Sequence, residues 1–100
     1  MRKYELNKCT LEIKNMPKSN WHNGMVIESG YDSTVVIAVF DNLEDAKKEL
    51  KKYKCEAKYL GGPKKTTKAT EYWIEENEYD ENDVYVETIR YHKGEYVNIR

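Results

Sequence analysis

The side chains that could act as nucleophiles, bases or zinc ligands are few, namely two cysteines and two histidines. A cysteine nucleophile needs a nearby base, and no local signature supplies one for Cys9 or Cys55. His22 and His92 lie beside Asn-Gly and Lys-Gly turn signals, where we expect exposed side chains. The four residues also lack the paired spacing of zinc ligands. The sequence therefore predicts a protein without catalytic residues, metal or cofactor.

Charge is strongly segregated along the chain. Residues 1–70 contain 14 Lys and Arg against 9 Asp and Glu, whereas residues 71–100 contain 3 against 9. The contrast is greatest between residues 46–70, with nine lysines, and residues 71–87, with eight carboxylates and no basic residue. A formal net charge of −1 conceals this layout. The electric field of such a charge separation affects solubility, the approach of charged ligands and the choice of partner rather than the fold.

The acidic stretch 71–87 has three interpretations. It can be a solvated hairpin loop, since charge runs commonly serve solubility. It can stand in for the phosphates of a nucleic acid and occupy the basic groove of a protein that handles DNA or RNA. It can also bind calcium at Asp80, Asn82 and Asp83, although it lacks the glycine and the spaced bidentate glutamate of an EF-hand loop.

The lysine stretch 46–70 could bind phosphates without sequence specificity. It contains no arginine, the residue that sequence-specific readers favour for bidentate contacts. Lysines are also the ordinary solvent-facing residues of an amphipathic helix, and the acidic stretch should repel a nucleic acid. We therefore expect no direct nucleic-acid contact, and keep a lysine-mediated nonspecific nucleic-acid binder as an alternative.

The clearest predicted elements are a strand and the helix that follows it. The unbroken, β-branched run Thr34–Phe40 is typical of a central strand covered on both faces. Asp41 and Glu44 are spaced as a capping box. A helix over residues 42–53 would carry one apolar stripe, formed by Leu43, Ala46, Leu50 and Tyr53.

Alternation and turn residues predict the other elements. The expected strands are 55–59, 71–76, 84–91 and 95–99, with a short one at Met25–Ile27. The expected loops are 64–69 and 77–83, with a tight turn at His92–Gly94. A change of apolar phase near Asn7 predicts a bulge in an N-terminal strand. The turn around Trp21 and His22 is interpreted as ordered, with a recognition loop as the alternative.

These elements predict a single α+β domain over residues 1–100. Its simplest form is one antiparallel or mixed sheet of five to six strands with the helix on one face. No run reaches the roughly 20 apolar residues of a membrane span, and the first residues lack the apolar core of a signal peptide. We therefore expect a cytoplasmic protein that does not bind membranes, with buried and reduced cysteines.

The predicted C-terminal hairpin suggests a binding surface. Closure about Asp80 would place Trp73, Glu75 and Tyr85 on one side, a mixture of aromatic and acidic residues found at protein interfaces. The candidate partner-binding residues are Trp73, Glu75, Glu78, Asp80, Glu81, Asp83 and Tyr85. The opposite, core-facing side would carry Tyr72, Ile74, Val84, Val86 and Thr88. A shift of one residue in register would exchange the two faces.

Two segments of the chain resemble a pattern found in known proteins. The strand-turn-helix run Val39–Lys48 and the later run Tyr72–Asp80 resemble a pattern in small uncharacterised α+β proteins of low-GC Gram-positive bacteria and their phages. The resemblance covers less than half of the chain and implies a small accessory or phage-borne protein. In size and acidic surface, the chain is similar to anti-CRISPR and other anti-defence inhibitors, which carries no catalytic residue onto it.

The sequence therefore predicts a non-enzymatic protein that binds a protein partner, as a monomer or homodimer. One form of this function is a phage-type inhibitor that places the acidic hairpin in a basic groove of a nucleic-acid-handling host protein. The alternative is a housekeeping interaction module with no decoy role.

Overall fold

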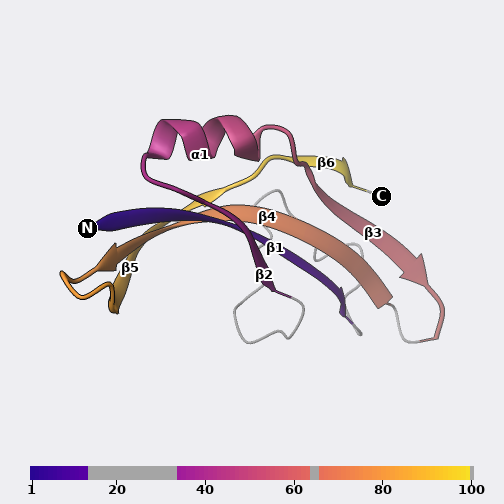
Figure 1. Cartoon of the computed structure of the whole chain (residues 1–100). Coiled ribbons are helices and arrows are strands. Elements are labelled where there is room, and N and C mark those ends of the chain that lie inside the picture. The colour runs from indigo at the N-terminus through magenta and orange to yellow at the C-terminus, as the bar shows by residue number, and fades with distance from the viewer. Residues whose placement is uncertain (14–33, 64–65, 100) are drawn as a thin grey trace.

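The computed structural model describes residues 1–13, 34–63 and 66–99. In this part of the chain, six strands form one sheet and a single helix packs on one of its faces (Figure 1). The elements are β1 (Arg2–Ile13), β2 (Val35–Phe40), α1 (Leu43–Leu50), β3 (Cys55–Gly61), β4 (Thr66–Tyr79), β5 (Tyr85–Lys93) and β6 (Tyr96–Ile99). The predicted α+β class is confirmed. The expected strand Met25–Ile27 and the turn around Trp21 lie outside the described residues.

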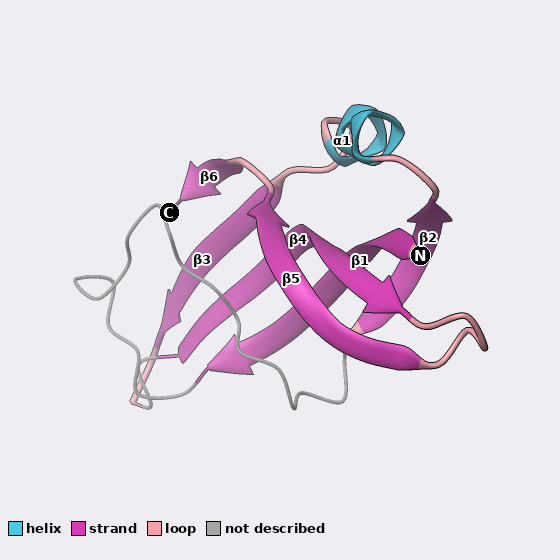
Figure 2. Ribbon diagram, turned by 90° about the vertical axis from the view of Figure 1, so that its left-hand side faces the viewer, coloured by secondary structure: helices cyan, strands magenta, loops and turns pink. Residues whose placement is uncertain are grey.

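The sheet is built around β4. β1 runs antiparallel to β4 without interruption, from the pair Arg2 and Glu78 to the pair Ile13 and Thr67, and β2 lies on the other side of β1. The opposite edge of β4 is shared, because β3 pairs with its first part and β5 with its second (Figure 2). β6 pairs with β3 in parallel, so the sheet is mixed.

The core under α1 is formed by alternate residues of the strands. Leu6 and Ile74 are fully buried and pack against Ala46 and Leu50 of the helix. The partly buried residues around them are Tyr4, Ala38, Phe40, Leu43, Tyr53 and Tyr72. The predicted apolar stripe of the helix therefore faces the sheet as expected, and it anchors α1 across β1, β2 and β4.

The face of the sheet away from α1 is also buried at its centre. Successive residues of a strand point to opposite faces, and the residues out of phase with Leu6 and Ile74 include the buried Asn7, Cys9, Ala69, Trp73 and Asn77. Burial on both faces explains the change of apolar phase in β1. The predicted irregularity near Asn7 is present only in the pairing with β2, whereas the pairing with β4 is regular.

The helix begins one residue later than predicted. Asn42, not Asp41, is the N-cap, because its backbone is extended (φ −140°, ψ 153°) and its Oδ1 accepts from Asp45 N at 2.9 Å. Asn42 Nδ2 in turn donates to Asp45 Oδ2 at 3.0 Å. The regular helix ends at Leu50, and Tyr53 N donates to Leu50 O at 3.0 Å in a tighter last turn.

β4 is longer than predicted at both ends. The expected loop 64–69 is part of the strand from Thr66 onward, and Thr67 and Ala69 are buried. The expected acidic loop 77–83 is shorter, because β4 continues to Tyr79. Pairing with the twelve residues of β1 supplies backbone partners along β4 and overrides its polar composition. The half-buried strand predicted at 55–59 is confirmed as β3.

The chain passes from β5 to β6 without the hairpin turn predicted at His92–Gly94. β3 and β5 are both antiparallel to β4, so they run in one direction, and β6 continues in that direction beside β3. Gly94 N donates to Tyr72 O at 2.9 Å. A Cβ at Gly94 would lie 2.8 Å from that oxygen, so the glycine serves a close backbone approach.

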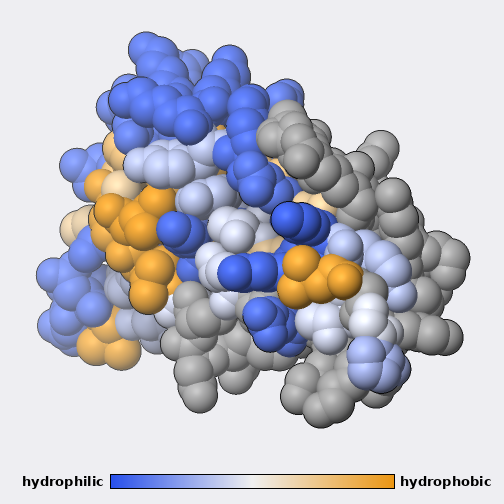
Figure 3. Space-filling view, turned by 90° about the vertical axis from the view of Figure 1, so that its right-hand side faces the viewer, coloured by the Kyte–Doolittle hydropathy of each residue, from blue (hydrophilic) through white to orange (hydrophobic). Residues whose placement is uncertain are grey.

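β2 is an edge strand, so its predicted central position is wrong. In the described part of the chain it pairs only with β1, and Val35, Val36 and Val39 are about half exposed. A β-branched run indicates a strand but does not fix how deeply the strand is buried. Figure 3 shows apolar side chains gathered on the flank of the molecule that carries β2, below the hydrophilic surface of α1.

Candidate interaction surface at the β4–β5 hairpin

The register of the hairpin differs from the predicted one. Tyr79 pairs with Tyr85, and Glu75 pairs with Tyr91. Closure about Asp80 would instead have paired Glu75 with Tyr85. The predicted register is wrong because the turn is centred two residues later, and because β5 contains two irregularities that leave no mark in the apolar pattern.

The irregularities in β5 change which of its residues are exposed. The pairing skips Val86 and Ile89, which have no residue opposite them on β4. Val84 and Val86, expected in the core, are more than half exposed. Thr88, also expected there, donates to Asn77 Oδ1 at 2.7 Å on the face away from α1. The predicted core side of β5 is therefore wrong, whereas that of β4 is confirmed by Ile74 and Tyr72.

Asp80 holds the turn. Its Oδ1 accepts from Asn82 N at 2.8 Å and from Val84 N at 3.0 Å, and its backbone N–H donates to Val84 O. Asp83 N donates to Asp80 O, and Asp83 adopts a left-handed backbone (φ 60°), which Asp tolerates better than most residues. Asp80 is thus committed to the turn, while Glu81 and Asp83 are exposed on it.

A hydrogen-bond network ties the base of the hairpin to β1. The Glu5 carboxylate accepts from Tyr79 OH and from Asn77 Nδ2, each at 2.8 Å. The bond to Glu5 raises the pKa of Tyr79, because it favours the protonated phenol. The hydroxyls of Tyr85 and Thr88 lie 2.9 Å apart, and the Tyr85 ring packs edge-on against Tyr79. These contacts hold Tyr85 in place although half of it is exposed.

The three predicted site residues on β4 itself, Trp73, Glu75 and Glu78, also interact within the chain. Trp73 is 9% exposed, and its indole N–H donates to Glu75 Oε1 at 3.5 Å. Glu78 pairs with Arg2 Nε at 3.3 Å and with the amino terminus of Met1 at 3.4 Å. The structure therefore places Trp73 and Glu75 together, as predicted, but on a buried part of β4 and not at the exposed hairpin.

The exposed residues of the turn and of β5 are a mixture of apolar and acidic side chains from both sides of the hairpin. The hairpin surface, as we name it, consists of Val84, Tyr85, Val86, Ile89 and Tyr91 with the acidic Glu81, Asp83 and Glu87. Its turn extends past the other elements at the right of Figure 2. Asp83 lies 4.0 Å from Lys3 Nζ, and within the described ranges Glu81 and Glu87 form no ion pair. Val84 and Val86 were expected in the core, but Val84 lies in the turn before β5 begins, and Val86 is the extra residue of a bulge.

Comparison with known proteins gives no relative, since no protein family, curated protein or solved structure matches the chain. The described helix is too short and too polar to cross a membrane. Within residues 1–13, 34–63 and 66–99, no group of three or more His, Cys, Asp or Glu side chains is arranged to hold a metal ion. Cys9 and Cys55 are free and buried, and burial raises the pKa of Cys55.

Proposed function

We propose that this protein is a non-enzymatic binding protein and that the hairpin surface contacts its protein partner. The observation that carries the proposal is the exposure of five large apolar side chains within residues 84–91, beside three acidic residues. Folded monomers rarely expose such side chains together unless they contact something. Tyr85 supports this role, because its packing against Tyr79 fixes it before any partner binds.

The composition of the hairpin surface defines the partner's chemistry. Valine, isoleucine and tyrosine side chains supply burial, whereas Glu81, Asp83 and Glu87 favour a partner with basic residues around an apolar patch. Proteins that bind nucleic acid carry such basic surfaces. We therefore propose, as the first form to test, an inhibitor that occupies the nucleic-acid groove of a host protein. An interaction module without a decoy role is the alternative.

Capture from a lysate of a low-GC Gram-positive bacterium tests the proposal, with variants that spare the fold. Val86→Lys should abolish capture of any specific partner, whereas Val36→Lys should not. The two valines match in exposure, at 55% and 51%, but lie on different strands. Capture that survives Val86→Lys and is lost with Val36→Lys would place the contact on β2 and refute the proposal.

Charge is tested by Glu81→Lys combined with Asp83→Asn. Asparagine is chosen because residue 83 has a left-handed backbone, and Asp80 is left intact because it holds the turn. Glu56→Lys with Asp41→Asn makes the same charge change at exposed sites elsewhere. If the protein is a decoy, partner binding should be lost in the Glu81→Lys/Asp83→Asn variant but not in the control variant. Binding of the unmodified protein should weaken with added salt, and DNA or RNA should compete with it. Binding that nucleic acid fails to displace would favour the interaction module.

A further inference from the structure

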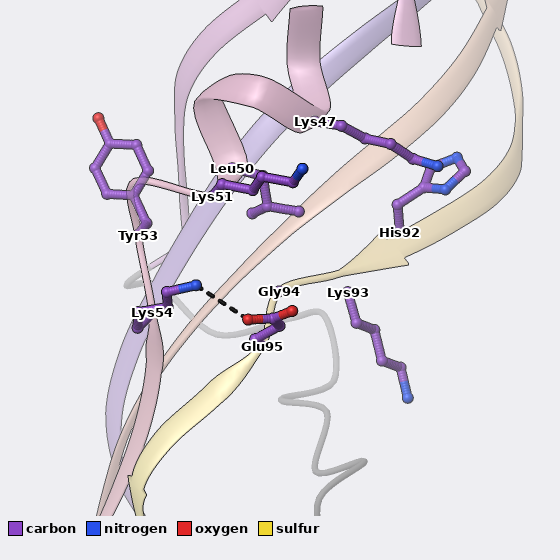
Figure 4. A pocket seen from close by; sticks show the side chains of 9 residues that line it. All are labelled: Lys47, Leu50, Lys51, Tyr53, Lys54, His92, Lys93, Gly94 and Glu95. Atoms are coloured by element: carbon purple, nitrogen blue, oxygen red, sulfur yellow. Dashed lines mark hydrogen bonds and ion pairs between the residues drawn. The ribbon is translucent and has the colours of Figure 1, made fainter. Parts of the chain in front are cut away.

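A pocket lies between the end of α1 and the junction of β5 and β6. Its volume is about 170 Å³, and its walls come from three segments: α1, the α1–β3 connection and residues 92–95. Leu50 and Tyr53 provide its apolar part, and the backbone of Gly94 forms part of its wall. Figure 4 shows Lys47 reaching from α1 toward the strand that carries His92, with Lys51 beside Leu50.

Backbone contacts hold the walls of the pocket in place. Gly94 N donates to Tyr72 O at 2.9 Å, and Cys55 N donates to Glu95 O at 2.8 Å. Leu50 is 8% exposed and belongs to the core. These contacts join α1, β3, β4 and the start of β6 at one point, so the pocket needs no rearrangement to receive a ligand. A preformed site loses less entropy on binding than a mobile one.

The pocket carries an excess of positive charge. Four lysines line it against the single carboxylate of Glu95, which pairs with Lys54 at 3.1 Å. Of the neighbouring carboxylates, Glu49 pairs with Lys52 outside the pocket. Glu76 pairs with Arg2 at 3.1 Å through one oxygen, and its other oxygen lies 3.4 Å from Nε2 of His92 in the pocket wall. Within the described part of the chain, Lys47 and Lys51 form no ion pair. The pocket is therefore suited to an anion.

We propose that this pocket binds the phosphate group of a small phosphate monoester. Lysine ammonium groups act as point charges toward phosphate, and the pocket has no arginine for planar, bidentate recognition of a carboxylate. The apolar side of the pocket, at Leu50 and Tyr53, leaves a place for a small organic group attached to the phosphate. This inference goes beyond the proposed function and concerns residues outside the hairpin surface.

The test is a titration of the ¹⁵N-labelled protein with phenyl phosphate, followed by amide chemical shifts. The amides of His92, Gly94 and Glu95 should shift and saturate, and inorganic phosphate should bind the same site several-fold more weakly because it lacks the ring. Shifts that never saturate, or that spread evenly over all lysine-bearing segments, would overturn the proposal. Tighter binding of an oligothymidylate than of phenyl phosphate would also overturn it, because a strand of phosphodiesters would then be the better ligand.

Two double variants separate the pocket from general charge. Lys47→Gln with Lys51→Gln should weaken phenyl phosphate binding by tenfold or more. Lys58→Gln with Lys68→Gln removes the same charge from a directly opposed pair on β3 and β4, and should change the affinity less than twofold. All four lysines are exposed, so both variants should fold. Equal weakening by the two double variants would refute a specific pocket.

Discussion

The Sγ atom of Cys55 lies 3.2 Å from the backbone N of Tyr72 and accepts its hydrogen bond. At this residue the edge of β4 passes from one partner strand to the other, since Thr70 pairs with β3 and Trp73 with β5. The Cys55 thiol therefore accepts from the Tyr72 N–H at a position where neither β3 nor β5 supplies a backbone acceptor. The Tyr72 carbonyl oxygen accepts a hydrogen bond from Gly94 N. The junction of β3, β4, β5 and β6 thus depends on the Cys55 thiol as a small acceptor and on Gly94, which has no side chain.

Replacing Gly94 tests this junction. Gly94→Ala should lower the free energy of unfolding by about 1–3 kcal/mol, the usual range for overpacking, because the added Cβ meets the carbonyl oxygen of Tyr72 at 2.8 Å. Urea denaturation followed by tryptophan fluorescence measures the change. A loss below about 0.5 kcal/mol, typical of a surface substitution, would show that the strands do not approach so closely.

The thiol of Cys55 should react slowly in the folded protein. Cys55 is 2% exposed, and desolvation by burial raises its pKa, so the reactive thiolate is scarce near neutral pH. Labelling with a thiol reagent, read by mass spectrometry, should proceed only as fast as the protein unfolds. Rapid stoichiometric labelling under native conditions would contradict the buried position and reopen a nucleophilic role.

The position of the helix cap distinguishes two neighbouring residues. Asn42→Ala should destabilise the protein by about 1 kcal/mol, because it removes the acceptor for Asp45 N. Asp41→Ala should have an effect within about 0.5 kcal/mol, as for an exposed residue without such a role. Thermal unfolding of both variants is the check, and the reverse order of effects would restore Asp41 as the cap.

The sequence predicted the elements better than their arrangement. Local signals such as the apolar stripe ending at Leu50 and the alternation at Cys55 and Ala57 identify α1 and β3, since they depend on neighbours in the chain. The edge position of β2 and the parallel pairing of β6 depend on residues distant in sequence. Polar residues such as Asn77 were assigned to a loop, although Glu5 on β1 supplies its partner.

Only part of the candidate interaction surface could be predicted from the sequence, again because local signals identify the turn but not the contacts between distant strands. Glu81, Asp83 and Tyr85 are exposed as expected, because they lie at or next to the turn that composition identifies. Trp73 is buried because it lies near the centre of the sheet face away from α1, and Val86 is exposed at one of the two bulges in β5. A bulge adds one residue without changing residue types, so the apolar pattern does not reveal it.

The phenol of Tyr79 should ionise above its ordinary range. Its hydrogen bond to Glu5 raises the pKa of Tyr79 in the folded state, so the bond contributes stability below the unfolded pKa of about 10 and loses it as the pH rises through the folded value. NMR titration of the ring should show a midpoint that falls in the Glu5→Gln variant. An unchanged midpoint would mean that the bond to Glu5 does not form in solution.

Hydrogen exchange of the protein with and without the captured partner tests the central claim most directly. A contact through the hairpin surface should slow exchange of backbone amides in residues 81–91, where Val86 and Ile89 have no opposite residue on β4. Amides of β2, which pairs with β1 and is not part of the hairpin surface, should keep their rates. Protection confined to β2 or α1, with the hairpin unchanged, would contradict the proposed function.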